Sequence, residues 1–114
     1  MFDISVVLIT KILLVHYGAD FLLQSKWMAE NKSKENLPLL AHIGVYSLIL
    51  LLSFGSLKFA LVNGVAHFIT DYITSRAGRY TWERGNVRGF FAVLGLDQLM
   101  HYIVLFMTAL WYLT

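Results

Sequence analysis

The sequence predicts an all-α fold, an integral membrane four-helix bundle, and three observations support this prediction. The 114 residues are 58% hydrophobic and only 14% charged, whereas a soluble domain usually carries about 25% charged residues. Four stretches reach the length of roughly 20 mainly apolar residues that a membrane-crossing helix needs. The basic residues gather in two of the three connections between these stretches. A chain this short could not bury so much apolar surface in a soluble core, so we expect it to lie in lipid.

The expected spans form a single transmembrane domain over residues 1–114. In order they cover residues 4–24, 37–54, 57–75 and 89–113. The second span is the most regular, with Asn36 as an N-cap and Pro38 in the first turn. Polar residues interrupt the third, and the fourth ends on Trp111 and Tyr112, which are typical of the membrane interface.

The positions of the basic residues predict the orientation. Seven of them lie in or beside the first and third connections, which share one face, and Lys58 alone flanks the other face. These seven are Lys26, Lys32, Lys34, Arg76, Arg79, Arg84 and Arg88. By the positive-inside rule the two connections are cytoplasmic and both termini extracytoplasmic. Because topology accounts for the basic residues, no nucleic-acid partner is expected.

The acidic residues and histidines are also sorted. All three Glu residues lie in connections, whereas all four His and three of the four Asp residues lie inside spans. An Asp in the middle of a membrane helix costs ~2.5–3.5 kcal/mol on insertion scales, so such a residue normally has a partner and a function. Three His/Asp pairs are spaced four residues apart, which places both members of each pair on one helix face. A single pair could be a structural hydrogen bond between helices, but three pairs favour metal or proton chemistry.

These residues are the candidate metal ligands. They are His16, Asp20, His42, His67, Asp71, Asp97 and His101. At 1.5 Å per residue, all seven fall within a band ~6–18 Å below the cytoplasmic boundary. Seven ligands suit two or more zinc-like ions bridged by carboxylate, and the lack of cysteine excludes thiolate ligands. Gln24, Asn63 and Gln98 are expected either to orient these ligands or to make structural hydrogen bonds.

The same residues carry two further patterns. The segment His16-Tyr-x-x-Asp20-Phe matches His67-Phe-x-x-Asp71-Tyr, which favours two parallel helical hairpins related by duplication. The combined HxxxDFxxQ, NxxxHxxxD and DQxxH motifs resemble an uncharacterised family of small bacterial and phage membrane proteins, classed as a domain of unknown function. The chain is more loosely similar to bacterial inner-membrane proteins regarded as metal-dependent hydrolases, and through them to zinc-dependent phospholipase C and single-strand nuclease folds. This resemblance implies the bacterial inner membrane and hydrolytic chemistry.

The expected function is a membrane-embedded metal-dependent hydrolase that cleaves a phosphoester of a lipid or lipid-linked substrate at the cytoplasmic leaflet. The metal would lower the pKa of a bound water, and Asp20, Asp71 or Asp97 would be the general base. Membrane lipid, a lipid substrate and a second copy of the chain are the partners that this interpretation allows. The alternatives are a metal-ion or proton transporter acting as an oligomer, and a non-catalytic phage membrane effector. A hydrolase needs a substrate-sized opening beside the metal, whereas a transporter needs a path to both faces.

Overall fold

The computed structural model describes residues 5–114, and all its regular structure is helical. The elements are α1 (Val6–Tyr17), the π-helical segment η1 (Gly18–Leu22), α2 (Lys26–Asn31), α3 (Asn36–Phe54), α4 (Leu57–Glu83) and α5 (Val87–Tyr112). The predicted all-α class is confirmed. The predicted count of four helices is wrong for residues 5–114, because Ser25 caps an additional short helix, α2, in the first connection. Ile4, where the first predicted span begins, lies outside the described residues.

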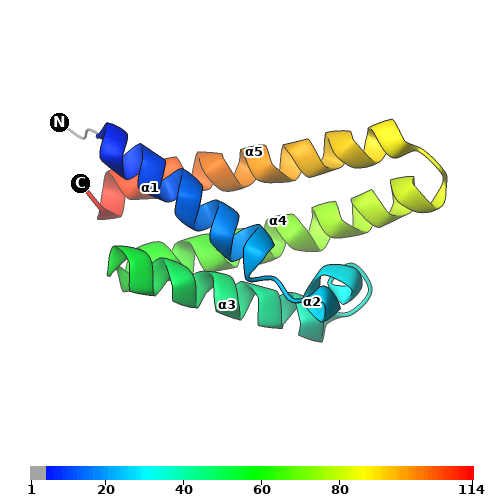
Figure 1. Ribbon diagram of the computed structural model, residues 1–114, viewed down its shortest axis with the longest axis horizontal. Helices are drawn as coiled ribbons and strands as arrows, with labels where there is room; N and C mark the ends of the chain where they lie inside the picture. Colours follow the sequence, from blue (N-terminus) through cyan, green and yellow to red (C-terminus); the bar gives the residue numbers. More distant parts are fainter. Residues whose placement is uncertain (1–4) are drawn as a thin grey trace.

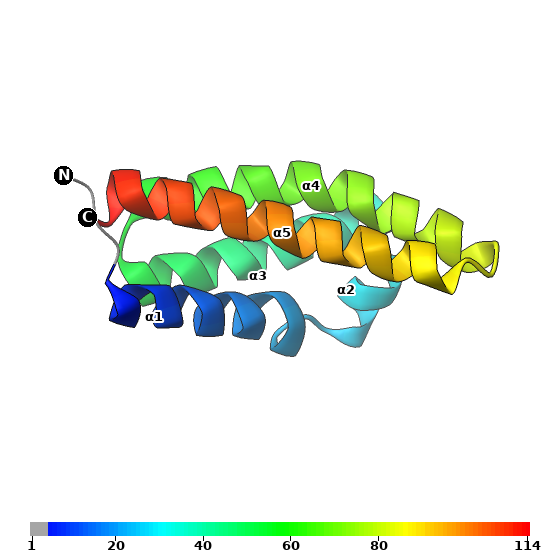
Figure 2. The ribbon, with the colours of Figure 1, turned by 90° about the horizontal axis from the view of Figure 1, so that it is seen from above.

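The long helices lie side by side along the long axis of a body that measures 47 × 26 × 20 Å (Figures 1 and 2). The start of α1, the C-terminus and the α3–α4 turn lie at one end, which we call the terminal end (Figure 1). Helix α2 and the α4–α5 turn lie at the other, which we call the α2 end. Helices α1 and α4 run in the same direction, and the duplication suggested by their shared motif stays a prediction.

Caps and glycines set the helix boundaries. Ser5, Ser56 and Asn86 each accept a hydrogen bond from the backbone N–H three residues later, at 2.9–3.1 Å. Such caps satisfy N–H groups that have no partner within the helix. Gly55 and Gly85 turn the chain after α3 and α4 with φ angles of 69° and 71°, a conformation that glycine adopts without strain.

Helix α4 is longer than its predicted span of 57–75. It continues to Glu83, so the basic segment expected as a loop is mostly helical. Hydropathy marks only the apolar part of a helix, and nothing prevents the helix from continuing beyond it. Gly78 lies against the ring of Phe90 in this extension, so α4 and α5 stay close together. The expected N-cap Asn36 is instead the first residue of α3, and its side chain accepts a hydrogen bond from Arg76 at 3.2 Å.

The interior of the bundle is apolar toward the terminal end. Its buried residues are Ile12, Ala19, Tyr46, Leu50, Phe59, Ala60, Leu105 and Ala109. The outer faces are apolar as well. Within residues 5–114, α3 and α5 are each long and apolar enough to cross a membrane, and only 28% and 17% of their apolar stretches is buried. Apolar surface of this extent normally faces lipid or another protein.

Candidate metal centre

The seven candidate ligands meet inside the bundle. They come from α1, η1, α3, α4 and α5, and all are buried, with Asp97 the most exposed at 6%. The ligand atoms form two groups, and within each group all of them lie within 4.8 Å of one another. Asp20, His42, His67 and Asp71 form the first group, and Asp20, Asp97 and His101 form the second. Each group could hold a metal ion, and Asp20 belongs to both. The structure therefore shows a buried Asp/His cluster that could hold a metal ion, and the metal site itself stays a prediction.

Asp20 connects the helices at the centre of this cluster. It lies in η1, where the N–H of Leu23 bonds to the carbonyl of Gly18, five residues earlier. Its Oδ1 accepts hydrogen bonds from Nε2 of His42 at 2.9 Å and Nε2 of His67 at 3.1 Å. One carboxylate oxygen therefore joins α3 and α4. Turns of π-helix are frequent at functional sites, and this one holds the residue that both ligand groups share.

Asp71 pairs with Lys32, which is the only lysine that contacts the cluster in the described part of the chain. Its Oδ2 lies 3.5 Å from His42 Nε2 and 3.6 Å from His67 Nδ1, and it accepts a hydrogen bond from Lys32 Nζ at 3.2 Å. With neutral histidines, three carboxylates and one lysine leave a formal charge of −2. Buried charge needs a compensating partner. One divalent cation or two protonated histidines would provide it.

His101 belongs to the second group and also approaches Asp71 of the first. Its Nε2 lies 3.2 Å from Asp97 Oδ2 and 3.5 Å from Asp71 Oδ1. It hydrogen-bonds to neither oxygen, and among residues 5–114 it has no other partner. A buried nitrogen without a hydrogen bond is costly. A cation between His101 and the two carboxylates would satisfy it, so these residues fit a metal ion.

His16 belongs to neither ligand group. Its Nε2 is 2.8 Å from Gln98 Oε1, and its Nδ1 is 2.8 Å from the hydroxyl of Tyr46. An amide oxygen only accepts, so Nε2 donates to Gln98 and the Tyr46 hydroxyl donates to Nδ1. Both ring nitrogens are engaged in this way, and His16 Nε2 is 3.6 Å from Asp20 Oδ2. Its role as a metal ligand stays a prediction.

The three amides separate into different roles. Gln98 contacts the cluster, because its Nε2 donates to Asp20 at 3.0 Å and to Asp97 at 3.1 Å. Asn63 instead donates to Thr108 Oγ1 at 2.8 Å and so links α4 to α5. Gln24 lies beyond the end of η1, and its buried Oε1 has no hydrogen-bond partner within residues 5–114. Of the three amides, Gln98 is therefore the one in place to orient ligands.

Three residues that the sequence did not indicate as site residues also contact the cluster. Tyr46 holds His16, Thr74 donates a hydrogen bond to Asp97 Oδ1, and Lys32 pairs with Asp71. Tyr46 is four residues after His42, and Thr74 is three after Asp71, so helical spacing could have indicated both. Lys32 lies in a connection between spans, where periodicity gives no signal.

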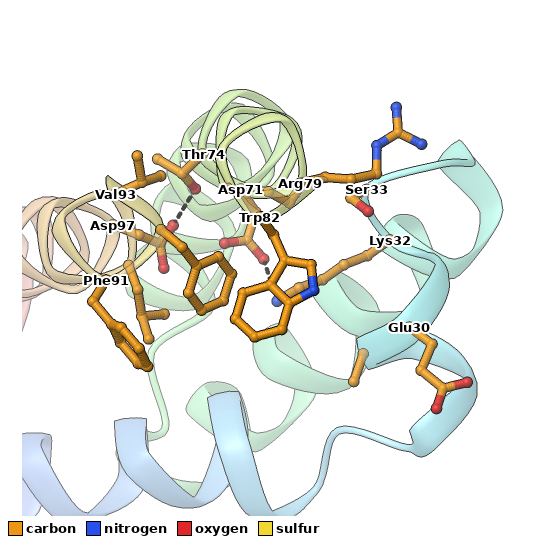
Figure 3. Close-up of a pocket in the computed structure, with 15 residues that line it drawn as sticks. Glu30, Lys32, Ser33, Asp71, Thr74, Arg79, Trp82, Phe91, Val93 and Asp97 are labelled. Carbon is orange, nitrogen blue, oxygen red and sulfur yellow. Dashed lines mark hydrogen bonds and ion pairs between the residues drawn. The ribbon is translucent and has the colours of Figure 1, made fainter. Parts of the chain in front are cut away.

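A cavity of about 560 Å³ connects the cluster to the α2 end. It is lined in and after α2 by Ala29, Glu30, Lys32 and Ser33, by residues of α4 between Asp71 and Trp82, and by residues of α5 between Phe90 and Asp97. Figure 3 shows Asp71 and Asp97 on neighbouring helices at this cavity, with Lys32 reaching Asp71 and the guanidinium of Arg79 directed away. Asp71 and Asp97 therefore belong both to the ligand groups and to the cavity wall.

Comparison with known proteins gives a family and no activity. The family model described as "Protein of unknown function (DUF3307)" matches residues 8–114. No curated protein and no solved structure matches the chain.

Proposed function

The chain belongs to the DUF3307 family of proteins of unknown function, and we propose that it is a membrane-embedded metal-dependent hydrolase acting on a phosphoester of a lipid or lipid-linked substrate. One observation carries the proposal: two residues of the buried ligand groups, Asp71 and Asp97, line a cavity of about 560 Å³. Small-molecule sites commonly measure 300–1,000 Å³. A substrate in this cavity would therefore reach a metal held by the cluster.

The proposed setting is the bacterial inner membrane, in a bacterial or phage-encoded protein. Four segments would cross it: α1 with η1, α3, α4 and α5. The exposed apolar faces of these helices support this placement, and the basic residues near the α2 end would place that end in the cytoplasm and both termini outside. At 1.5 Å per residue, the 27 residues of α4 span ~40 Å, whereas the hydrocarbon core is ~30 Å thick. The cavity at the α2 end would then lie near the lipid headgroups.

The proposed cofactor is one or two zinc-like ions. The group Asp20, His42, His67 and Asp71 offers four ligands, the number in a structural zinc site. The group Asp20, Asp97 and His101 offers three and leaves a position open, as catalytic zinc sites do. A bound ion would activate water and polarise the phosphoryl oxygen.

The aspartates would then have different roles. Asp20 does not line the cavity and accepts three hydrogen bonds, which suits a carboxylate shared by two ions. Asp97 lines the cavity, and the hydroxyl of Thr74 holds its Oδ1. We assign Asp97 as the general base when a single ion occupies the group Asp20, His42, His67 and Asp71, because Asp97 is then not a ligand and still lines the cavity.

The closed terminal end supports a hydrolase over a transporter. A transporter needs a polar path to both ends of the bundle. On the terminal side of the cluster, apart from the hydrogen-bonded pair Asn63 and Thr108, the interior is filled by apolar side chains. Ile12, Leu50, Phe59 and Leu105 are among them, each at most 1% exposed. The cavity that reaches the ligands opens at the α2 end. A non-catalytic effector would require neither the ligands nor this cavity.

The test is hydrolysis by the purified protein in detergent after loading with zinc or manganese. Short-chain lipid phosphomonoesters and phosphodiesters are incubated with the protein, and products are identified by mass spectrometry. We expect the protein to cleave at least one of these substrate classes and a chelator to abolish the cleavage. The Asp97→Asn variant should have no activity, and the Asn63→Ala variant should keep it. Asn63 is a matched control, since it is buried on α4 but bonds to Thr108 outside the cluster. A metal-loaded protein that leaves the whole panel intact would contradict the proposal.

A further inference from the structure

Lys32 differs from the other lysines near the α2 end. It follows directly after α2, and its side chain is 20% exposed, whereas that of Lys26 is 86% exposed. Its ammonium group lies 3.2 Å from Asp71 Oδ2 inside the cavity (Figure 3). A lysine that only marked the cytoplasmic side of a membrane would extend into solvent. The position of Lys32 therefore requires another explanation.

Lys32 and a metal ion would compete for the same atom. Asp71 Oδ2 is the oxygen that approaches both His42 and His67, at 3.5 and 3.6 Å. It is therefore the oxygen through which Asp71 would complete the four-residue ligand group. An ammonium ion and a divalent cation at one carboxylate oxygen repel each other, so each weakens the binding of the other. Metal binding would release Lys32, whose flexible four-carbon stem allows it to move within the cavity.

The cavity wall indicates what the released ammonium would meet. The wall is apolar on α5 and the end of α4, where Trp82, Phe90, Phe91, Val93 and Leu94 line it. Phe91 is 58% and Leu94 37% exposed, so this wall continues into the apolar outer surface of the bundle. The inner end is charged, with Asp71, Asp97 and Lys32. The cavity therefore suits an amphiphile with a charged group inside and an apolar chain along α5.

The charge of the inner end determines the sign of that group. Without metal, two carboxylates face one lysine, so an anion would be repelled. One divalent ion raises the formal charge from −2 to zero and two ions raise it to +2, so the repulsion of an anion disappears and the released ammonium is free to bind a phosphate. We propose that Lys32 passes from Asp71 to the phosphate of an anionic amphiphile when metal binds, and that the apolar chain of this amphiphile lies against α5. This inference rests on the metal site of the proposed function and specifies how its substrate is recognised.

The alternative is that Lys32 only attaches α2 to the bundle. Removing it would then loosen the cavity and Asp71 together, and metal affinity would fall. The proposal predicts the opposite sign, because a competitor for Asp71 disappears. Lys34, two residues further, is exposed, and no ion pair of its side chain is present in the described structure. It is the matched control.

The experiment compares the full chain with its Lys32→Met, Lys32→Arg and Lys34→Met variants in uncharged detergent micelles. Zinc affinity is measured by competition with a chelating dye. For the zinc-loaded proteins, titration calorimetry then measures binding of short-chain phosphatidic acid. Diacylglycerol of the same chain length lacks the phosphate, and glycerol phosphate lacks the chains.

For Lys32→Met we expect zinc affinity to rise by about threefold to tenfold, since a nearby positive charge is removed. Affinity for phosphatidic acid should fall by about tenfold or more, the loss expected for one charge-assisted hydrogen bond. Lys32→Arg should restore most of the lipid binding, and Lys34→Met should change neither affinity. Diacylglycerol and glycerol phosphate should both bind at least about tenfold more weakly than phosphatidic acid.

Reduced zinc affinity in Lys32→Met, or unchanged binding of phosphatidic acid, would overturn the inference while leaving the metal site standing. Glycerol phosphate that binds as tightly as phosphatidic acid would overturn the apolar part of the site. A wild-type protein that binds no zinc would remove the proposed function and this inference together.

Discussion

Asp20→Asn is the substitution that tests the shared ligand most severely. Asparagine has the same shape as aspartate but carries no charge, so helix packing around η1 is preserved. In the native chain the carboxylate accepts hydrogen bonds at 2.9, 3.1 and 3.0 Å from His42, His67 and Gln98. It is also the one residue common to both ligand groups. The change therefore affects both groups at once.

The magnitude follows from the role of the carboxylate. Loss of a residue that only orients a ligand lowers metal affinity by about 10–100-fold. Loss of a shared, charged ligand must exceed this, so we expect a decrease of at least about 100-fold, or roughly 2.7 kcal/mol. Without metal the effect is smaller. The bonds from His42 and His67 to Oδ1 become neutral, at about 1 kcal/mol each, and the bond from Gln98 to Oδ2 is lost because the amide NH2 at that position cannot accept. One negative charge also leaves a cluster whose formal charge is −2. The two contributions oppose each other.

The assay is zinc competition against a chelating dye, together with thermal unfolding in detergent with and without zinc. Wild-type protein should gain several degrees in its midpoint from zinc, and Asp20→Asn should gain almost none while keeping a similar metal-free midpoint. Asn63→Ala should lower the metal-free midpoint yet keep the gain from zinc. Asp20→Asn protein that binds zinc with wild-type affinity would refute the assignment of Asp20 as the shared ligand.

Three further predictions concern the surroundings of the cluster. Tyr46→Phe removes the donor to His16 Nδ1 and leaves that buried nitrogen unsatisfied. We expect it to destabilise the protein by about 1–3 kcal/mol in thermal unfolding, with metal stoichiometry unchanged in metal analysis. A large loss of metal would refute the separation of His16 from the ligand groups. Phe59→Ala, in the terminal-end core, should lower the free energy of unfolding by about 3–5 kcal/mol because it creates a cavity, and metal should again be retained. An unfolding midpoint close to that of wild type would argue against a packed core there. Because the chain has no cysteine, the variants Lys34→Cys and Thr114→Cys each carry a single site for a membrane-impermeant maleimide. The two cysteines should react from opposite sides of membrane vesicles. Labelling of both from one side would contradict the four-span orientation.

The sequence predicts the polar cluster well because helical spacing is local. His67 and Asp71 are four residues apart, so any regular helix places them on one face, and a shared height along the bundle brings such faces together. The same reasoning does not locate His16, whose two nitrogens are engaged by Tyr46 and Gln98. Which of several inward-facing histidines meets which aspartate depends on helix rotation. The π-helical turn at Asp20 affects that rotation, and its position has no simple sequence signal.

The hydropathy pattern of the sequence could not predict the features that form the cavity. Apolar windows mark where a helix can contact lipid, so they could not show that α4 continues to Glu83 or that α2 forms between spans. Lys32 was interpreted from its charge alone, as a marker of the cytoplasmic side. Its contact with Asp71, 39 positions away, depends on how α2 packs against α3, which requires the tertiary structure.

The metal content of the purified protein decides whether the Asp/His cluster binds a metal. Elemental analysis by mass spectrometry would compare wild type with the His67→Ala/Asp71→Ala double variant, and with Asn63→Ala as a folded control from the same helix. We expect near-stoichiometric zinc, manganese or iron in wild type and in Asn63→Ala. The double variant should lose this metal while its helical content persists. A wild-type protein that holds no metal, even after zinc is added back, would contradict the account and leave a hydrogen-bonded helical bundle.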